Sequence, residues 1–213
     1  MKKQKKSGIV GWMAFLVCVF AISSCTYHVP DEDWEKNGKV RLHLDWQTRS
    51  SYPSGMTYYF YKDGTGHPVV RSGSATGYEG TLPSGHYKVV VCNTDCDNVQ
   101  LEMNNGYEQA LGKARLISSL KSASVHIARP GNLYGTGCQS IDVGGEKTVV
   151  EELYPVSLVK TLELNIKVTG GEDIRLTGLS GRLTGVSSQI QIPTGKALFD
   201  TPAFMAFEPE SAN

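Results

Sequence analysis

Apolar and polar side chains alternate along several stretches of this chain, and this alternation constrains the fold more than any other feature. The clearest example is the run TLELNIKV at 161–168, whose members on one face would be Leu162, Leu164, Ile166 and Val168. Successive side chains of a β-strand point to opposite faces, so a period of two is typical of half-buried strands. Similar runs occupy residues 40–46, 57–63, 86–93, 98–103, 123–129 and 147–153.

Turn-forming residues separate these runs at regular intervals. Clusters of Gly, Pro, Asn and Asp lie at 62–64, 83–85, 104–106, 144–145 and 170–171. Short alternating runs bounded by such clusters indicate an antiparallel β-sandwich. Helical spacing of apolar residues is confined to the stretch 107–120, so we predict an all-β fold with at most a turn or two of helix there.

The lengths of the runs predict two sandwiches in succession, with a boundary near Tyr154 and Pro155. Residues 39–155 are long enough for one complete N-terminal sandwich. Residues 156–213 supply about four strands, and four strands with two open edges rarely close a core alone. We therefore expect a second, incomplete sandwich, either completed by another chain or shorter here than in related proteins.

The first 24 residues have the features of an export signal. Four Lys residues precede the apolar run Ile9–Ile22, which is shorter than the roughly 20 residues that span a bilayer. The triplet Ser23-Ser24-Cys25 then matches a bacterial lipobox, although an ordinary secretory signal with an incidental Cys is the alternative. We predict lipidation of Cys25, so that acyl chains hold the mature chain at a membrane.

Residues 25–38 have no periodicity and are predicted to form an acidic tether. Three acidic residues, Asp31, Glu32 and Asp33, follow the lipobox closely. They resemble the signal that exports Bacteroidetes lipoproteins to the outer face of the outer membrane, and the alternative is a solvated linker. The expected location is therefore the outer membrane, with the lipid-anchored protein facing the cell surface.

The charge balance changes when the predicted signal is removed. The whole chain has 21 basic and 21 acidic residues, and residues 1–24 hold four Lys and no acid. The mature chain therefore has an excess of four acidic residues. Proteins that bind nucleic acids usually carry a basic patch, so no nucleic-acid partner is expected.

No stretch of the chain carries a recognisable catalytic motif. Nucleophile elbows, HExxH sequences, P-loops and GxGxxG sequences are all missing. The five histidines are scattered: His28, His43, His67, His86 and His126. We therefore predict a protein that is not an enzyme and that has no cofactor and no metal site.

Three cysteines remain after the signal and the lipidated residue are set aside, and an odd number cannot all pair. Cys92 and Cys96 flank a turn and could form a disulfide in the oxidising periplasm. Alternatively, Cys92 is a small buried hydrophobe and Cys96 a loop thiol. Cys138 lies far in sequence from the other two cysteines. A zinc site would need four ligands at close spacing, and the sequence does not supply them.

The lipobox and several strand sequences together resemble a known group of lipoproteins. The sequences are GKVRLHLDW, YFY with a following DG, LPSGHYKVVVCNTD and TLELNIKV with GGEDIRLTGLSGRLTGV. They are similar to Bacteroidetes fimbrial anchor lipoproteins, the FimB-type, fimbrillin-associated anchors and their uncharacterised relatives. The resemblance covers most of residues 22–190.

The resemblance implies two transthyretin-like sandwiches on a lipid anchor, and fimbrial subunits as partners through strand complementation. It implies an anchor or accessory subunit of a fimbria-like assembly as the function. This sequence departs from the pattern because it stops early in the second domain.

A cluster of aromatic residues suggests an alternative function, the binding of a glycan or host ligand. Its members are Trp34, Trp46, Tyr52, Tyr58, Tyr59, Phe60 and Tyr61. Exposed aromatic rings could form a carbohydrate platform. The other interpretation is a single strand with Tyr58 and Phe60 inward and Tyr59 and Tyr61 outward.

Overall fold

The structure is a computed structural model that describes residues 37–49, 51–118, 125–167, 169–170, 178–200 and 202–207. These residues belong to the compact unit Glu35–Asn213, whereas the unit Met1–Trp34 lies outside them. Within the described ranges the chain forms β-strands and one short 3₁₀ helix, η1 (Tyr107–Gln109). The predicted all-β fold class is confirmed. The helical turn predicted in 107–120 is reduced to η1, and strands follow it.

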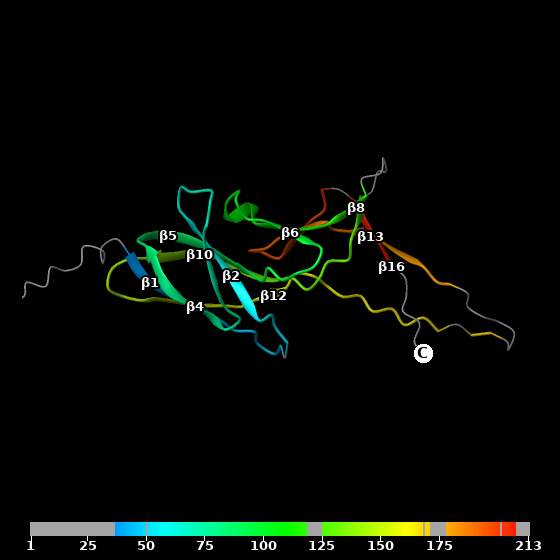
Figure 1. The fold of residues 1–213 in the computed structure, drawn as a ribbon, viewed down its shortest axis with the longest axis horizontal. Coiled ribbons are helices and arrows are strands. Elements are labelled where there is room, and N and C mark those ends of the chain that lie inside the picture. The colour runs from blue at the N-terminus through cyan, green and yellow to red at the C-terminus, as the bar shows by residue number, and fades with distance from the viewer. Residues whose placement is uncertain are drawn as a thin grey trace, which may run out of the picture. The chain divides into compact units, whose positions relative to one another are not determined.

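Eight of the described strands form the largest sheet, in the order β11-β1-β4-β3-β2-β5-β10-β12. Its members are β1 (Asn37–Leu44), β2 (Gly55–Lys62), β3 (Val69–Ser74), β4 (Gly77–Pro83), β5 (Gly85–Cys92), β10 (Tyr134–Val143), β11 (Val149–Leu153) and β12 (Val156–Ser157). Most neighbours are antiparallel, but β1 and β11 run parallel, with Val40 opposite Val149. Figure 1 shows these strands in colours that run from blue at β1 through cyan and green to yellow-green at β11 and β12.

Two smaller sheets complete the described fold. One has the order β15-β14-β7-β6 and contains β6 (Val99–Glu102), β7 (Leu111–Ala114), β14 (Gln189–Gln191) and β15 (Lys196–Leu198). The other has the order β13-β16-β9-β8 and contains β8 (Leu116–Ser118), β9 (Val125–Ile127), β13 (Gly181–Val186) and β16 (Ala203–Phe207).

The alternation at the start of the described chain builds one face of the first core. On β1, Val40, Leu42 and Leu44 are buried, whereas Lys39, Arg41 and His43 are exposed. Trp46 continues the buried face, and its indole Nε1 donates a hydrogen bond to the Ala75 carbonyl oxygen at 2.6 Å.

The large sheet closes around this core, because strands far apart in its order contribute to the same cluster. Phe60 from β2, Val89 from β5, Val143 from β10 and Leu153 from β11 all pack with the buried residues of β1. Strands β3 and β4 are joined by the single residue pair Ser74 and Gly77.

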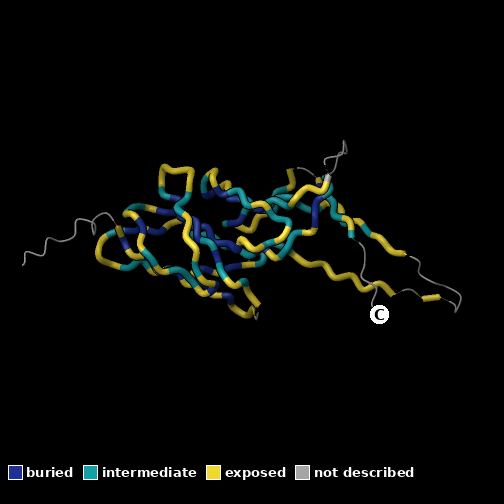
Figure 2. The backbone as a smooth tube through the Cα atoms, in the orientation of Figure 1, coloured by how far each residue is buried: buried dark blue, intermediate teal, exposed yellow. Residues whose placement is uncertain are grey.

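A second core lies on the other face of β2 and β5. Tyr59, Tyr61, Val90 and Cys92 belong to this cluster, although they alternate with residues of the first core. Ala110, Leu133, Leu158 and Ile192 cover them. The interpretation that Tyr58 and Phe60 point inward and Tyr59 and Tyr61 outward is therefore wrong for the second pair, because both faces of β2 are covered (Figure 2).

The strands do not divide at the predicted boundary near Tyr154 and Pro155. Strand β12 follows it directly and pairs with β10 in the large sheet. Beyond it, β14 pairs with β7 and β16 pairs with β9, so both small sheets combine strands from the two sides. The physical reason is that the edges and apolar faces of β7 and β9 need partners, and residues 181–207 supply them.

The run that alternates most regularly is not in a strand. Residues 161–167 have no regular secondary structure, and residue 168 lies outside the described ranges. The predicted strand at 161–168 is thus wrong for its described part. Strand structure requires a hydrogen-bonded neighbour, and no described strand lies beside this segment.

Candidate interaction surface

The predicted lipidation and export residues cannot be placed in the fold. Cys25, Asp31, Glu32 and Asp33 all lie outside the described residues. Lipidation and surface export therefore remain predictions from the sequence. Where the chain is described, no helix has the length and the apolar character required to cross a membrane.

The three cysteines of the folded unit are free thiols. Cys92 ends β5 and is fully buried, and this burial raises the pKa of its thiol well above the ordinary value. Cys96 lies in the following loop, where partial burial also raises its pKa. No disulfide joins Cys92 to Cys96 in this structure, so their pairing under oxidising conditions stays a prediction. The high pKa values of both thiols argue against either residue as a nucleophile.

The loop that carries Cys96 is fixed by a buried asparagine. Asn93 is 2% exposed, and its amide Nδ2 donates to the carbonyl oxygen of Asn132 at 2.9 Å. Its Oδ1 accepts a hydrogen bond from the backbone N–H of Tyr134 at 2.7 Å. A buried polar group is stable when it is paired in this way, so Asn93 connects the end of β5 to the start of β10.

The aromatic cluster forms core rather than an exposed platform. Tyr58 and Phe60 are fully buried in the first core, and Tyr59 and Tyr61 are nearly so in the second. Desolvation raises the pKa of Tyr59 to about 12. Only Tyr52 is on the surface among the described members, and its ring stacks on Trp46 with centroids 5.4 Å apart. The described members of the cluster therefore do not form a platform of several exposed aromatic rings.

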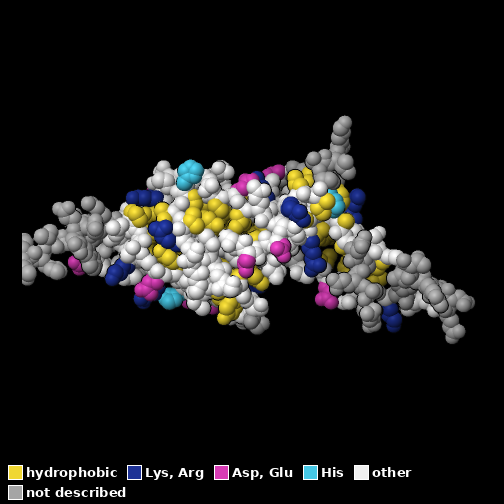
Figure 3. Space-filling model, in the orientation of Figure 1, with side chains coloured by type: hydrophobic (Ala, Val, Ile, Leu, Met, Phe, Trp, Pro, Cys, Tyr) yellow, Lys and Arg dark blue, Asp and Glu magenta, His cyan; other side chains and the backbone are white. Residues whose placement is uncertain are grey.

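The described histidines do not gather into a metal site. His43, His67 and His86 are exposed at separate positions, and His28 lies outside the described ranges. No group of three or more His, Cys, Asp or Glu side chains within the described part of the chain could hold a metal ion. Figure 3 shows basic and acidic side chains interspersed on the face that it displays.

His126 takes part in a stack that the sequence pattern did not indicate. Its ring lies parallel to Phe204 with centroids 4.7 Å apart, and the guanidinium carbon of Arg182 is 4.1 Å from the centre of the Phe204 ring. The three residues come from β9, β16 and β13. Such stacking is worth about 1 kcal/mol a pair and ties β9 to the C-terminal strands.

An open depression of about 620 Å³ lies beside β6, β7 and β14. Lys113 and Arg115 line it together with the amide side chains of Asn98, Gln100 and Gln189. Lys113 is already paired with Glu102 at 2.7 Å. The depression brings together no pair of acid and base groups that could perform catalysis.

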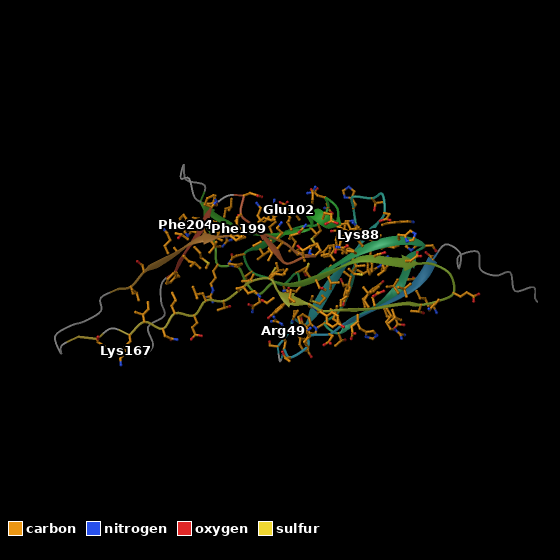
Figure 4. The ribbon with its side chains drawn as sticks, turned by 180° about the vertical axis from the view of Figure 1, so that it is seen from behind. Arg49, Lys88, Glu102, Lys167, Phe199 and Phe204 are labelled. Atoms are coloured by element: carbon orange, nitrogen blue, oxygen red, sulfur yellow. The ribbon has the colours of Figure 1, made fainter. Side chains whose placement is uncertain are left out.

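The most unusual surface is the stretch 161–167, called here the exposed segment. Leu162, Leu164 and Ile166 are 61%, 55% and 58% exposed, and every residue between them is exposed as well. Figure 1 shows this part of the chain without strand arrows, and Figure 2 shows it exposed along its length. In Figure 4, the Lys167 side chain projects from it into solvent. Three large aliphatic side chains at alternating positions form an apolar face with no cover among the described residues.

The chain leaves the second core just before this segment. Leu158 is 8% exposed in that core, and its backbone N–H donates to the Leu133 carbonyl oxygen at 2.8 Å. Ser157 Oγ donates to the carbonyl oxygen of Val159 at 2.7 Å. The exposed segment is therefore attached to a fixed point of the fold at residues 157–159.

A family model, described as a domain of unknown function (DUF5119), matches residues 25–208. The chain belongs to the DUF5119 family. This DUF5119 protein is 29% identical over 100 residues to a proposed fimbrium anchoring subunit, Fim4B, of Bacteroides ovatus. The aligned part is 46% of this chain and 30% of that relative. The resemblance to fimbrial anchor proteins inferred from the sequence is confirmed by these matches.

Two solved structures share the fold of this DUF5119 protein. A proposed adhesin from Bacteroides ovatus aligns with a TM-score of 0.60 at 22% identity, covering 82% of this chain and 62% of that one. A proposed polysaccharide-binding protein from Bacteroides thetaiotaomicron aligns with a TM-score of 0.52 at 11% identity, covering 82% and 65%. The chain thus spans less than two thirds of the length of these proteins.

Proposed function

We propose that this protein is a non-enzymatic, surface-displayed lipoprotein that serves as an anchor or accessory subunit of a fimbria-like assembly. The observation that carries the proposal is the apolar face of the exposed segment. Burying a large aliphatic side chain contributes about 1.5–3 kcal/mol. With more than half of each side chain still in water, a partner would gain about 1 kcal/mol from each of the three.

A strand from another polypeptide of the assembly is the partner that fits this segment best. Strand addition supplies backbone hydrogen bonds, and alternate side chains supply specificity. The exposed segment offers both, because its backbone has no sheet neighbour and its apolar side chains occur at every second position. The family match and the relative named for fimbrium anchoring support this reading.

The lipid on Cys25 would supply the membrane attachment that an anchor subunit needs. Two or three acyl chains hold a protein at a membrane almost permanently, whereas one chain holds it only marginally. Export to the outer face of the outer membrane, directed by the acidic tether, would then place the sandwich where fimbriae assemble. No cofactor or metal is required for such a role.

The test is a pull-down of the tagged protein from intact cells of a fimbriated Bacteroides host. We expect fimbrial subunits to be recovered with the wild type and to be lost with the double substitution Leu164→Ser, Ile166→Ser. Val150→Ser is the matched control, because Val150 is 55% exposed, as Leu164 is, but lies on β11. The failure of the wild-type protein to recover any fimbrial subunit would refute the proposal.

A further inference from the structure

The order of side chains in the exposed segment makes it complementary to itself. In a strand, this segment would carry Leu162, Leu164 and Ile166 on an apolar face and Glu163, Asn165 and Lys167 on the other face. The acidic and the basic residue are placed symmetrically about Asn165. If a second copy of the segment runs antiparallel and is centred on the same residue, each Glu163 lies opposite the Lys167 of the other copy.

We propose that the exposed segment pairs with the same segment of a second copy of this chain, in an antiparallel two-fold register centred on Asn165. The inference rests on the proposed function, because it takes the segment as a site that accepts a strand, and it names the partner. A strand has two edges, so self-pairing on one edge leaves the other open to a different subunit.

Charge favours the register centred on Asn165 over registers centred on nearby residues. A two-fold pairing centred on Glu163 places two carboxylates directly opposite each other, and a pairing centred on Lys167 places two ammonium groups opposite each other. Like charges directly opposite are destabilising, and opposite charges are stabilising. The pairing centred on Asn165 gains two Glu–Lys pairs and has no like-charge pair.

The apolar face selects the same register. In a pairing centred on Asn165, Leu164 lies opposite Ile166 of the other copy on one common face. A slip by one residue would place apolar side chains opposite polar ones, because the side-chain period of a strand is two. Pairings centred on Leu164 or Ile166 also place apolar residues opposite apolar residues. In these registers, however, Glu163 of one copy does not lie opposite Lys167 of the other.

The size of the surface predicts a weak dimer in solution. A stable protein–protein interface buries more than about 1,000 Å², and a single pair of short strands lies at or below this limit. Tethering by lipid in one membrane would raise the effective concentration of the two copies and strengthen the pairing. The experiment therefore needs high protein concentrations.

The test is sedimentation equilibrium of the mature chain, residues 25–213 with Cys25→Ser, up to millimolar concentration. We expect the wild type to dimerise reversibly. Glu163→Lys or Lys167→Glu alone creates two like-charge pairs in the dimer, so each should weaken association about tenfold or more. The double variant Glu163→Lys, Lys167→Glu restores both pairs and should restore the dimer.

A charge control and a second readout make the test specific. Glu146→Lys changes the net charge equally at an exposed turn outside the segment, so association should be unchanged. Hydrogen exchange at 161–167 should be slow in the wild-type dimer and fast in either single variant. A wild type that remains monomeric throughout, or a double variant that behaves like the single ones, overturns the proposal.

The two proposals fail separately. A chain that is monomeric when purified but recovers fimbrial subunits from cells refutes only the self-pairing. A chain that dimerises with the expected charge dependence but recovers no fimbrial subunit refutes only the proposed function.

Discussion

Replacing Ile192 by Ala should destabilise the whole described unit rather than its C-terminal part alone. Ile192 is fully buried in the second core, and its backbone N–H donates to the carbonyl oxygen of Ala110 at 2.9 Å. The substitution removes three carbon atoms, worth about 0.8 kcal/mol each in transfer free energy. With the cavity left behind, the free energy of unfolding should fall by about 3 kcal/mol.

Urea unfolding followed by tryptophan fluorescence measures the loss of stability at Trp46, which lies in the other core. Trp46 belongs to the first core, whereas Ile192 belongs to the second. In a protein of residues 25–213 with Trp34→Phe, Trp46 is the sole tryptophan. We expect Ile192→Ala to lower the midpoint of the Trp46 transition without a change in its slope, because the cores share β2 and β5.

Leu164→Ala is the matched control, because Leu164 is 55% exposed and its truncation should change stability by less than about 0.5 kcal/mol. An unchanged Trp46 midpoint in Ile192→Ala, beside a separate earlier transition detected by circular dichroism, would refute the reasoning. Residues after 155 would then unfold as an independent domain, as the sequence pattern first indicated.

Further predictions concern the anchor, the tether and the buried side chains. Cys25→Ser should abolish lipid labelling and release the protein from the membrane fraction, so normal retention would contradict the lipobox assignment. Alanine at Asp31, Glu32 and Asp33 should leave lipid labelling intact but reduce protease accessibility on whole cells. Stability should fall as the pH rises from about 10 to about 12, because burial raises the pKa of Tyr59 to about 12 and the neutral phenol is the form that the fold stabilises. Tyr59→Phe should reduce that loss in alkaline urea titrations. Native maleimide labelling should modify Cys96 and Cys138 before Cys92, which is fully buried.

The alternation in the sequence correctly predicted which residues of a strand share a face. It did not predict which faces are covered by other strands. The buried residues of β1 follow the period of two, because one face of that strand meets solvent. On β2 the same period is present, yet Tyr59 and Tyr61 are buried as well. A pattern of local spacing carries no information on the distant strands that cover the second face.

The remaining differences also come from contacts between distant residues. Whether 161–167 becomes a strand depends on a neighbour to hydrogen-bond with, and its alternating sequence alone cannot supply one. The stack of His126, Phe204 and Arg182 joins three strands. Because two of these strands lie far from β9 in the sequence, local patterns do not predict the contact. The aromatic cluster was recognisable from the sequence, but its burial required knowledge of the second core.

The pairing of β7 with β14 and of β9 with β16 has a consequence for the order in which the chain can fold during its synthesis. The second core needs Ile192, and β9 needs Phe204. Neither can be completed before residues 192 and 204 have been synthesised. Non-local pairings of this kind fold slowly, on the scale of milliseconds to seconds. During that interval the face of β2 and β5 that belongs to the second core is open to aggregation, so a chaperone would have a well-defined surface of the nascent chain to protect.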